Sequence, residues 1–205
     1  MENVTVELKA FLERYYPISD ADFDLFSKRV FLVEKAPKEK LIDEGETEDH
    51  VYFVSKGIFR KYFRKGDEEI ITGFFREGDV CQSAVSYFTG LPSSFIIEAI
   101  EPTVCLGIRR HDLEFLIEVI PGLEKIFRAV LASLFVKKDL ERMHQMKFSK
   151  KERFLQFCDD EPELLMRVPQ KQLASYLEIA PETFCRMKQM RYKLAKGTRV
   201  QLQEN

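Results

Sequence analysis

The pattern of hydrophobic and polar positions divides the chain into a helical start, a strand-rich middle and a helical end. Apolar residues recur at helical spacing over Val4–Tyr15 and Asp20–Val30. Ser19 is suited to cap the second helix, with Asp22 at its third position. From Lys40 to Arg109 the pattern changes to short runs of β-branched and aromatic residues, which predict strands.

The strand-rich middle predicts an antiparallel sandwich or roll with the shape of a small β-barrel. The runs that predict its strands are Val51–Val54, Ile58–Phe63, Glu69–Phe75, Phe95–Ile100 and Val104–Ile108. Glycines punctuate the first half of this region, and Lys65-Gly66-Asp67 is suited to a hairpin turn. Strands of this length and turn spacing are typical of all-β folds rather than of alternating helices and strands.

Helical periodicity returns after Arg110. A short helix is expected through Ile117, and a long one, opened by Pro121 at a first-turn position, continues to Gln145. The long helix carries a broad apolar stripe, which consists of Leu123, Ile126, Phe127, Val130, Leu131, Leu134 and Phe135. A stripe of this width must pack against a large surface.

A C-terminal domain begins near Phe148. Ser149-Lys-Lys-Glu152 is a capping-box pattern that starts a helix, and Asp159-Asp-Glu-Pro162 ends it. The fold class is therefore α+β, in three parts. Residues 1–120 hold the β-roll with its flanking helices, residues 121–147 hold the long helix, and residues 148–205 form the C-terminal domain.

Residues 169–191 have the pattern of a helix-turn-helix, in which two short helices cross steeply after a tight turn. The apolar residues expected to pack these helices together are Leu173, Leu177, Ile179, Phe184 and Met187. Ala174 permits a close crossing, and Pro181 is suited to start the second helix. Glu178 occupies the turn position where glycine is usual, which predicts a positive φ and strain of about 1 kcal/mol.

The second of these helices is suited to read the major groove of DNA. Arginine pairs with guanine, and a carboxylate accepts a hydrogen bond from the cytosine amino group. The candidate DNA-binding residues are Gln170, Lys171, Pro181, Glu182, Thr183, Arg186, Lys188 and Gln189. Among them Gln170, Lys171 and Lys188 are better placed for phosphates than for bases. An ordinary helical hairpin is the alternative interpretation.

The apolar stripe on the long helix has two interpretations. It covers the β-roll alone, or it covers the roll with one edge and a second copy of itself with the other. We favour the second interpretation, because helix-turn-helix proteins generally read paired half-sites as two-fold dimers.

The net charge of −2 conceals an uneven distribution. Residues 164–205 carry eight lysines and arginines against three acids, a net charge of +5, so the first 163 residues carry −7. Local charge governs phosphate neutralisation, and a basic module on an acidic body is common in DNA-binding proteins. Charge alone is equally compatible with a solvated basic face.

Composition limits the cellular setting. No segment approaches the ~18 uncharged apolar residues of a membrane span, and the acidic N-terminus lacks a signal-peptide pattern. We therefore expect a cytoplasmic protein with no membrane partner. The four cysteines, Cys81, Cys105, Cys158 and Cys185, include no CxxC pair, so we expect buried thiols rather than disulfides or metal ligands.

These residues and the order of the parts resemble the cyclic-AMP receptor protein/FNR (CRP/FNR) family of bacterial transcription factors. The resemblance covers nearly the whole chain, and its glycines and aromatic landmark are Gly45, Tyr52, Gly57 and Gly78-Asp79. It implies a cyclic-nucleotide-binding-type roll of the jelly-roll, or double-stranded β-helix, type over Lys40–Ile108. It further implies a dimerisation helix and a homodimer that binds near-palindromic operator DNA and contacts RNA polymerase.

The effector site departs from the family pattern. Members that bind cyclic AMP hold the ribose with a Gly-Glu pair and the cyclic phosphate with an Arg-Ser/Thr pair. The corresponding residues here are Gln82-Ser83 and Ser93-Ser94, which supply neither the carboxylate nor the guanidinium. Because a buried phosphate needs its cation, we expect no useful binding of cyclic AMP. Gln82, Ser83, Ser93 and Ser94 are the candidate pocket for another small-molecule effector, and no cofactor is expected.

The C-terminal end predicts a reduced wing. Only one strand, Thr198–Leu202, has room to form after the second helix, and it would pair with Leu165–Val168. Two alternatives to a DNA-binding regulator are a β-roll that senses ligands or binds proteins without specific DNA contact, and an enzyme. We expect no enzyme, because His50, His111 and His144 have no patterned carboxylate partners and no catalytic set is present.

Overall fold

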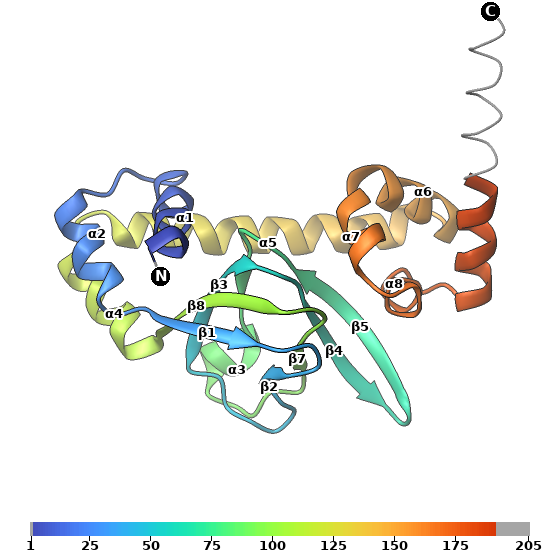
Figure 1. Ribbon diagram of the computed structural model, residues 1–205, viewed down its shortest axis with the longest axis horizontal. Coiled ribbons are helices and arrows are strands. Elements are labelled where there is room, and N and C mark those ends of the chain that lie inside the picture. Colours follow the sequence, from blue (N-terminus) through green and yellow to red (C-terminus); the bar gives the residue numbers. More distant parts are fainter. Residues whose placement is uncertain (1, 192–205) are drawn as a thin grey trace, which may run out of the picture. The chain divides into compact units, whose positions relative to one another are not determined.

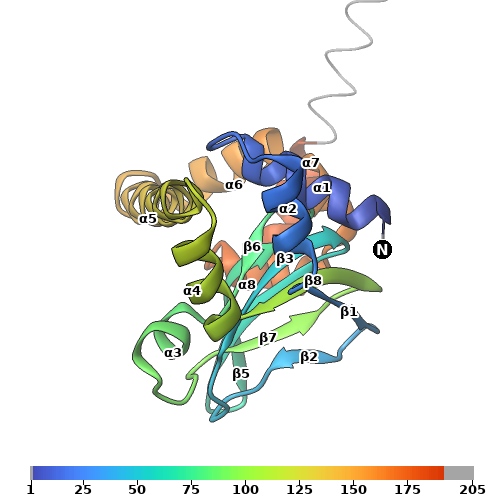
Figure 2. The same ribbon diagram turned by 90° about the vertical axis from the view of Figure 1, so that its left-hand side faces the viewer.

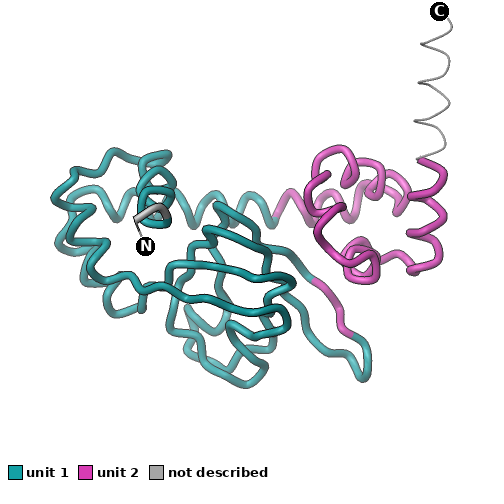
Figure 3. Tube along the Cα trace, in the orientation of Figure 1, with its two compact units in different colours: residues 1–68, 72–138 teal, residues 69–71, 139–205 magenta. Residues whose placement is uncertain are grey.

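The structure is a computed structural model that describes residues 2–191, and it forms two compact units (Figures 1 and 3). The first unit comprises residues 1–68 and 72–138, and the second comprises residues 69–71 and 139–205 as far as they are described. Helix α5 (Leu123–Lys147) passes from the first unit into the second. The overall class is α+β, as the sequence predicts.

The first unit contains two four-stranded sheets, and the antiparallel roll is confirmed. One sheet has the order β1 (Phe31–Lys35), β8 (Thr103–Arg109), β3 (His50–Lys56) and β6 (Val80–Cys81). The other has the order β2 (Lys40–Ile42), β7 (Ile96–Ala99), β4 (Phe59–Lys65) and β5 (Glu68–Phe75). Strand β8 pairs antiparallel with both β1 and β3, and β7 does so with β2 and β4. The expected hairpin turn is confirmed, with Gly66 at φ +60° between β4 and β5.

The roll begins earlier than the sequence pattern indicates. We placed its start at Lys40, whereas β1 begins at Phe31. This strand lies at the edge of its sheet, where the successive residues Phe31 and Leu32 are 37% and 36% exposed. Buried and exposed positions therefore do not alternate, and the pattern that predicts a strand is absent. The expected start of α5 at Pro121 is also wrong, because Gly122 has φ +86° and the helix begins after it.

Helices cover one face of the first sheet in this unit (Figure 2). They are α1 (Glu2–Glu13), α2 (Asp20–Ser27), α4 (Arg110–Val119) and the first half of α5. Ser19 caps α2 as predicted, its Oγ accepting a hydrogen bond from the Asp22 amide at 3.1 Å. A further helix, α3 (Ala84–Thr89), stands between β6 and β7 and was not predicted.

The central pair of strands, β3 and β8, is apolar on both faces. Alternation places Phe53 and Leu106 against the helices, whereas Tyr52, Val54 and Cys105 face the second sheet. Each face closes a separate core, one under the helices and one inside the roll. The two sets of neighbours thereby fix the register of these strands.

The second unit is helical and contains α6 (Lys150–Asp160), α7 (Pro162–Arg167), α8 (Gln170–Tyr176) and a helix over residues 181–191. The capping box is confirmed: the Glu152 amide donates to Ser149 Oγ, and the Ser149 amide donates to the Glu152 carboxylate at 2.8 Å.

The strand predicted over Leu165–Val168 is wrong, because most of it lies in α7, which Pro162 starts. Its expected partner, Thr198–Leu202, lies outside the described residues. Among the helices of residues 2–191, none is long and apolar enough to cross a membrane.

Candidate functional site

Two helices of the second unit, α8 and the helix over residues 181–191, cross closely. Leu173, Ala174 and Phe184 are fully buried between them and their neighbours. The Phe184 ring stands edge-on to Phe154 of α6, with 5.2 Å between ring centroids. The small side chain expected at the crossing is therefore in place, and the helix over residues 181–191 is held firmly by its inner side.

The turn between these helices has the conformation predicted for it. Glu178 has a φ of +57°, in the left-handed region that favours glycine. The Ile179 amide donates to the Ala174 carbonyl at 2.9 Å, which closes the turn. Arg153 of α6 forms an ion pair with Glu178 at 3.2 Å, and the Arg153 side chain is only 9% exposed. This ion pair offsets the strain of the positive φ at Glu178. A glycine at this position would not give Arg153 a carboxylate partner.

One side of the helix over residues 181–191 faces solvent. Glu182, Arg186 and Gln189 are exposed at intervals of four and three, so they share a helical face. Pro181 stands exposed at the start of the helix, as expected. Thr183 and Lys188 are partly buried at the edges of this face, whereas Gln170 and Lys171 are exposed on α8.

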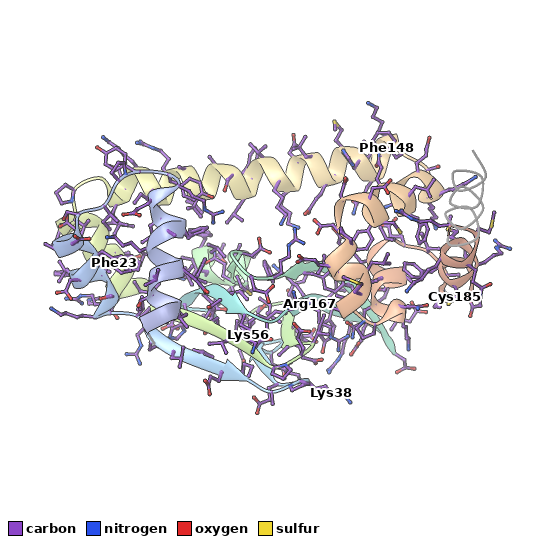
Figure 4. The ribbon with its side chains drawn as sticks, turned by 45° about the horizontal axis from the view of Figure 1, so that its top comes forward. Phe23, Lys38, Lys56, Phe148, Arg167 and Cys185 are labelled. Carbon is purple, nitrogen blue, oxygen red and sulfur yellow. The ribbon has the colours of Figure 1, made fainter. Side chains whose placement is uncertain are left out.

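Cys185 also lies on this exposed side (Figure 4). Its thiol donates a hydrogen bond to Gln170 Oε1 at 3.3 Å and so joins the two helices. The expectation that all four cysteines are buried is wrong here, although it holds for Cys81, Cys105 and Cys158. The sequence contained a signal for this position, because Cys185 follows Glu182 by three residues, a spacing that places both on one face of a helix.

The basic residues near this face have different surroundings. Arg191 donates to the Asp159 carboxylate at 2.7 Å and to the Leu155 carbonyl at 3.3 Å, which anchors the helix to α6. Arg186, in contrast, is exposed within the face that Glu182 and Gln189 share. The local excess of positive charge in the sequence could not distinguish Arg191, which anchors the helix, from Arg186, which is exposed.

The residues of the candidate effector pocket separate in the structure. Ser83 and Ser93 are buried and their hydroxyls lie 2.7 Å apart, so each hydroxyl has the other as its partner. The Ser93 backbone also bonds to Gly45 and Glu46. Ser94 is exposed, and Gln82 lines an apolar cavity instead. The structure thus joins Ser83 with Ser93 and leaves Ser94 apart.

A buried carboxylate, Glu48, lies beside α3 and was missed from the sequence. It is 3% exposed and accepts hydrogen bonds from the backbone amides of His50 and Ser83. Burial raises the pKa of Glu48 to about 7. His50 Nδ1 pairs with Asp49 and lies 3.8 Å from Glu48, so His50 has carboxylate neighbours that no pattern in the sequence indicated.

Arg60, a buried arginine of the roll, forms an ion pair with the carboxylate of Glu98. It lies 2.8 Å from Glu98, which also accepts a hydrogen bond from the Tyr62 hydroxyl at 3.0 Å. This cation is neutralised internally, so it does not replace the guanidinium that the pattern at Ser93 and Ser94 lacks.

Comparisons with known proteins agree with this arrangement. Residues 32–119, from β1 to α4, match the family model of the cyclic nucleotide-binding domain. No curated protein matches the chain. Among solved structures, FixK2 from Bradyrhizobium japonicum is 19% identical, with a TM-score of 0.70 over 81% of this chain and 86% of that one.

Two further solved structures are described as regulators. CLP, a c-di-GMP responsive global regulator of Xanthomonas campestris, is 14% identical, with a TM-score of 0.67 over 87% of this chain and 93% of that one. A putative CRP/FNR-family transcriptional regulator from Eubacterium rectale is 17% identical, with a TM-score of 0.65 over 90% and 89%. The expected resemblance is confirmed for the fold: residues 32–119 are similar to the cyclic nucleotide-binding domain, and the chain shares the fold of these regulators.

The buried Glu48 carboxylate predicts a pH-dependent stability. Its pKa is about 7 in the folded chain against an ordinary value of 4.5, so the folded state holds this proton more tightly. Protonated Glu48 contributes its full stabilisation to the free energy of unfolding below pH 4.5. This contribution, about 3 kcal/mol, is lost as the pH rises from 4.5 to 7. Glu48→Gln is expected to remove this loss. Urea unfolding of both proteins from pH 4.5 to 7.5 measures it, and parallel pH profiles would contradict the assignment.

Proposed function

We propose that this protein is a DNA-binding transcription regulator, in which a β-roll sensor is coupled to a helix-turn-helix that binds double-stranded operator DNA. The observation that carries the proposal is the exposed face of Glu182, Arg186 and Gln189. The opposite side of the same helix is fixed by the buried Phe184 and the Ala174 crossing. A rigid helix with a free polar face is the geometry that reads base edges in the major groove.

The chemistry of this face suits bases and phosphates in different places. Arg186 is suited to the two acceptors of guanine, and Glu182 to the amino group of cytosine. Gln170 and Lys171 lie on α8, outside the reading helix, and are suited to phosphates that set the register on the duplex. Cys185 and Gln170 hydrogen-bond to one another, which supports a common surface formed by both helices.

We further propose that α5 joins two copies of the chain. Large apolar side chains on this helix are exposed: Val136 by 53%, Leu140 by 51% and Met143 by 44%. They recur at intervals of four and three residues, which is the spacing of a coiled-coil seam. Phe135 and Met146 lie beside them and are 75% and 79% exposed. A second copy of α5 would cover this stripe and pair two helix-turn-helices for two half-sites.

Cyclic AMP is not the effector in this proposal. Ser83 and Ser93 satisfy each other, and the buried arginine Arg60 is neutralised by Glu98. The Glu48 carboxylate accepts the Ser83 amide and, when ionised, would repel a phosphate at this place. The departure from the family pattern therefore extends beyond the missing residues to a local environment that disfavours an anion.

Substitution of Arg186 tests the DNA-reading face. Arg186→Ala is expected to lower affinity for a selected operator by about 1–3 kcal/mol and to relax the preference at one base pair. Lys188→Ala is expected to weaken binding to all sequences alike, because a phosphate contact carries no sequence information. Fluorescence anisotropy across single-base operator variants measures both effects.

The matched control for these substitutions is Lys28→Ala, which removes a positive charge from the exposed position that follows the end of α2. It is expected to bind DNA as the unchanged protein does. If Arg186→Ala retains full affinity and the same base preferences, the helix over residues 181–191 does not read DNA.

A charge within the apolar stripe of α5 tests the dimer. Leu140→Glu is expected to yield monomers, because it places a carboxylate in the seam of two apolar helices. Gln145→Glu adds the same charge on the opposite side of α5 and is expected to leave the dimer intact. Sedimentation velocity separates the two states. A monomeric unchanged protein, or a dimeric Leu140→Glu, would exclude this interface.

A further inference from the structure

Three consecutive residues where the chain enters β3, Glu48, Asp49 and His50, bring three metal-binding atoms together in the first unit. One carboxylate oxygen from each acid and one imidazole nitrogen all lie within 4.8 Å of one another. His50 Nδ1 pairs with Asp49 Oδ1 and lies 3.8 Å from Glu48 Oε1. An imidazole with two carboxylates is a donor set that divalent first-row metal ions bind in proteins.

The Glu48 carboxylate is buried and lacks part of its expected bonding. Glu48 is 3% exposed, and its Oε2 has no hydrogen-bond partner among residues 2–191. When ionised, Oε2 is an acceptor without a donor, and when protonated it is a donor without an acceptor. Neither protonation state satisfies this atom, so it calls for a partner that the described residues do not supply, such as an ion or a water.

Charge favours an ion over a water. Within the described residues, no lysine or arginine forms an ion pair with Glu48 or Asp49, and His50 is their one basic neighbour at ion-pair distance. The Arg110 guanidinium lies nearby, but it donates to the Glu48 backbone carbonyl at 3.4 Å and stands over the Tyr87 ring. A buried carboxylate is stable as an anion only beside a compensating positive charge. A divalent cation would supply that charge, whereas a water would not.

The backbone holds the three donors in place. The Glu48 amide donates to Ser86 Oγ of α3 at 2.9 Å, and the Asp49 carbonyl accepts a hydrogen bond from the Arg110 amide at 2.7 Å. The His50 ring contacts two aromatic rings of the first sheet. Ligands that are fixed by their surroundings are already close to a binding geometry. The Asp49 side chain is 62% exposed, so the group is accessible to ions from solvent.

We propose that Glu48, Asp49 and His50 bind one divalent transition-metal ion, with Zn²⁺ as the expected occupant. The protein ligands would be His50 Nδ1 and one oxygen from each carboxylate, and water would complete the coordination beside Asp49. Zinc lies about 2.0–2.2 Å from such atoms, so side-chain rotations must bring the donors closer together. The two carboxylates balance the charge of the ion, so the occupied site has no surplus charge that would attract a phosphate.

The proposed ion would connect two helices of the first unit. Glu48 is bonded to Ser86 of α3, and Asp49 is bonded to Arg110 at the start of α4. An ion that favours one arrangement of these ligands shifts the population of the helix positions that match it. A regulatory effect of the metal rests on the proposed function, whereas binding of the ion does not.

Calorimetric titration of the full-length protein with ZnCl₂ or MgCl₂ tests the site, after removal of bound metal with EDTA and dialysis. One Zn²⁺ per chain is expected to bind with micromolar affinity. Binding of Mg²⁺ is expected to be at least about 100-fold weaker, because Mg²⁺ prefers oxygen ligands and loses its water reluctantly. The urea unfolding series on Glu48 uses protein treated in the same way, because a bound ion would keep the carboxylate ionised.

The paramagnetic ion Mn²⁺, which accepts the same donors, tests where the metal binds. MnCl₂ is titrated into the full-length, ¹⁵N-labelled protein, and the broadening of amide signals reports proximity to the ion. The signals of Glu48, Asp49, His50, Ser86 and Arg110 are expected to broaden first.

Substitutions test the individual ligands. Outer-shell partners of a metal contribute roughly 10–100-fold to affinity, so loss of the direct ligand in His50→Ala is expected to weaken Zn²⁺ binding by about 100-fold or more. Asp49→Asn, at an exposed position where the fold is not at risk, is expected to weaken it by at least about ten-fold. His111→Ala is the matched control, because His111 also has a carboxylate neighbour, Asp112 at 4.0 Å, but lies exposed on α4. It is expected to bind Zn²⁺ as the unchanged protein does.

Four results would overturn the proposal. They are no binding of Zn²⁺ at micromolar concentrations, unchanged affinity in both His50→Ala and Asp49→Asn, equal weakening by His111→Ala, and broadening by Mn²⁺ confined to residues outside the site. None of these titrations contains DNA, so their failure is distinguishable from failure of the DNA-binding proposal.

Discussion

The architecture of the first unit depends on one constraint, the burial of the β3–β8 strand pair on both faces. Phe53 and Leu106 need the helices, and Tyr52, Val54 and Cys105 need the second sheet. A shift of the strand register by one residue would exchange the two sets of side chains. Neither face of the strand pair would then pack against the core that fits it. The apolar cavity, the Ser83–Ser93 pair and the start of α5 all take their positions from this doubly covered pair of strands.

The second unit is packed differently, because its interior contacts leave one polar face of the helix over residues 181–191 exposed. Ala174 and Phe184 bring two helices together, and Arg191 and Asp159 add an anchor to α6. The strained turn at Glu178 persists because Arg153 pairs with its side chain. These contacts all use the inner side or the ends of the helix. Arg186 and Glu182 consequently remain available on the other side, with the rigidity that specific recognition needs.

Local signals in the sequence predicted those features that depend on a few neighbouring residues. The caps at Ser19 and Ser149 and the positive φ of Glu178 follow from short-range geometry, and each is confirmed. Strand β1 was missed because an edge strand has only one neighbour and need not alternate. Helix α3 was missed because six residues carry too little periodicity to detect.

Features that depend on distant residues were less accessible. Glu48 is unusual only because folding brings it against Ser83 and Ser86, and nothing in its own segment indicates burial. Gln82 was a candidate for its place in a family pattern, yet the cavity that it lines is built from seven separate elements. The helical face with Glu182 and Arg186 could be inferred because one short helix contains it. The environment of the effector site could not, because the whole first unit builds it.

In the function that we propose, the helix-turn-helix reads a defined operator as part of a dimer. The decisive measurement is the selection, from a random pool, of DNA that the full-length protein binds. Enrichment of one near-palindromic sequence is expected, with half-sites that lie about 34–36 Å apart, or a multiple of that distance. Recovery of no enriched sequence, or binding that depends only on DNA length and salt, would contradict it.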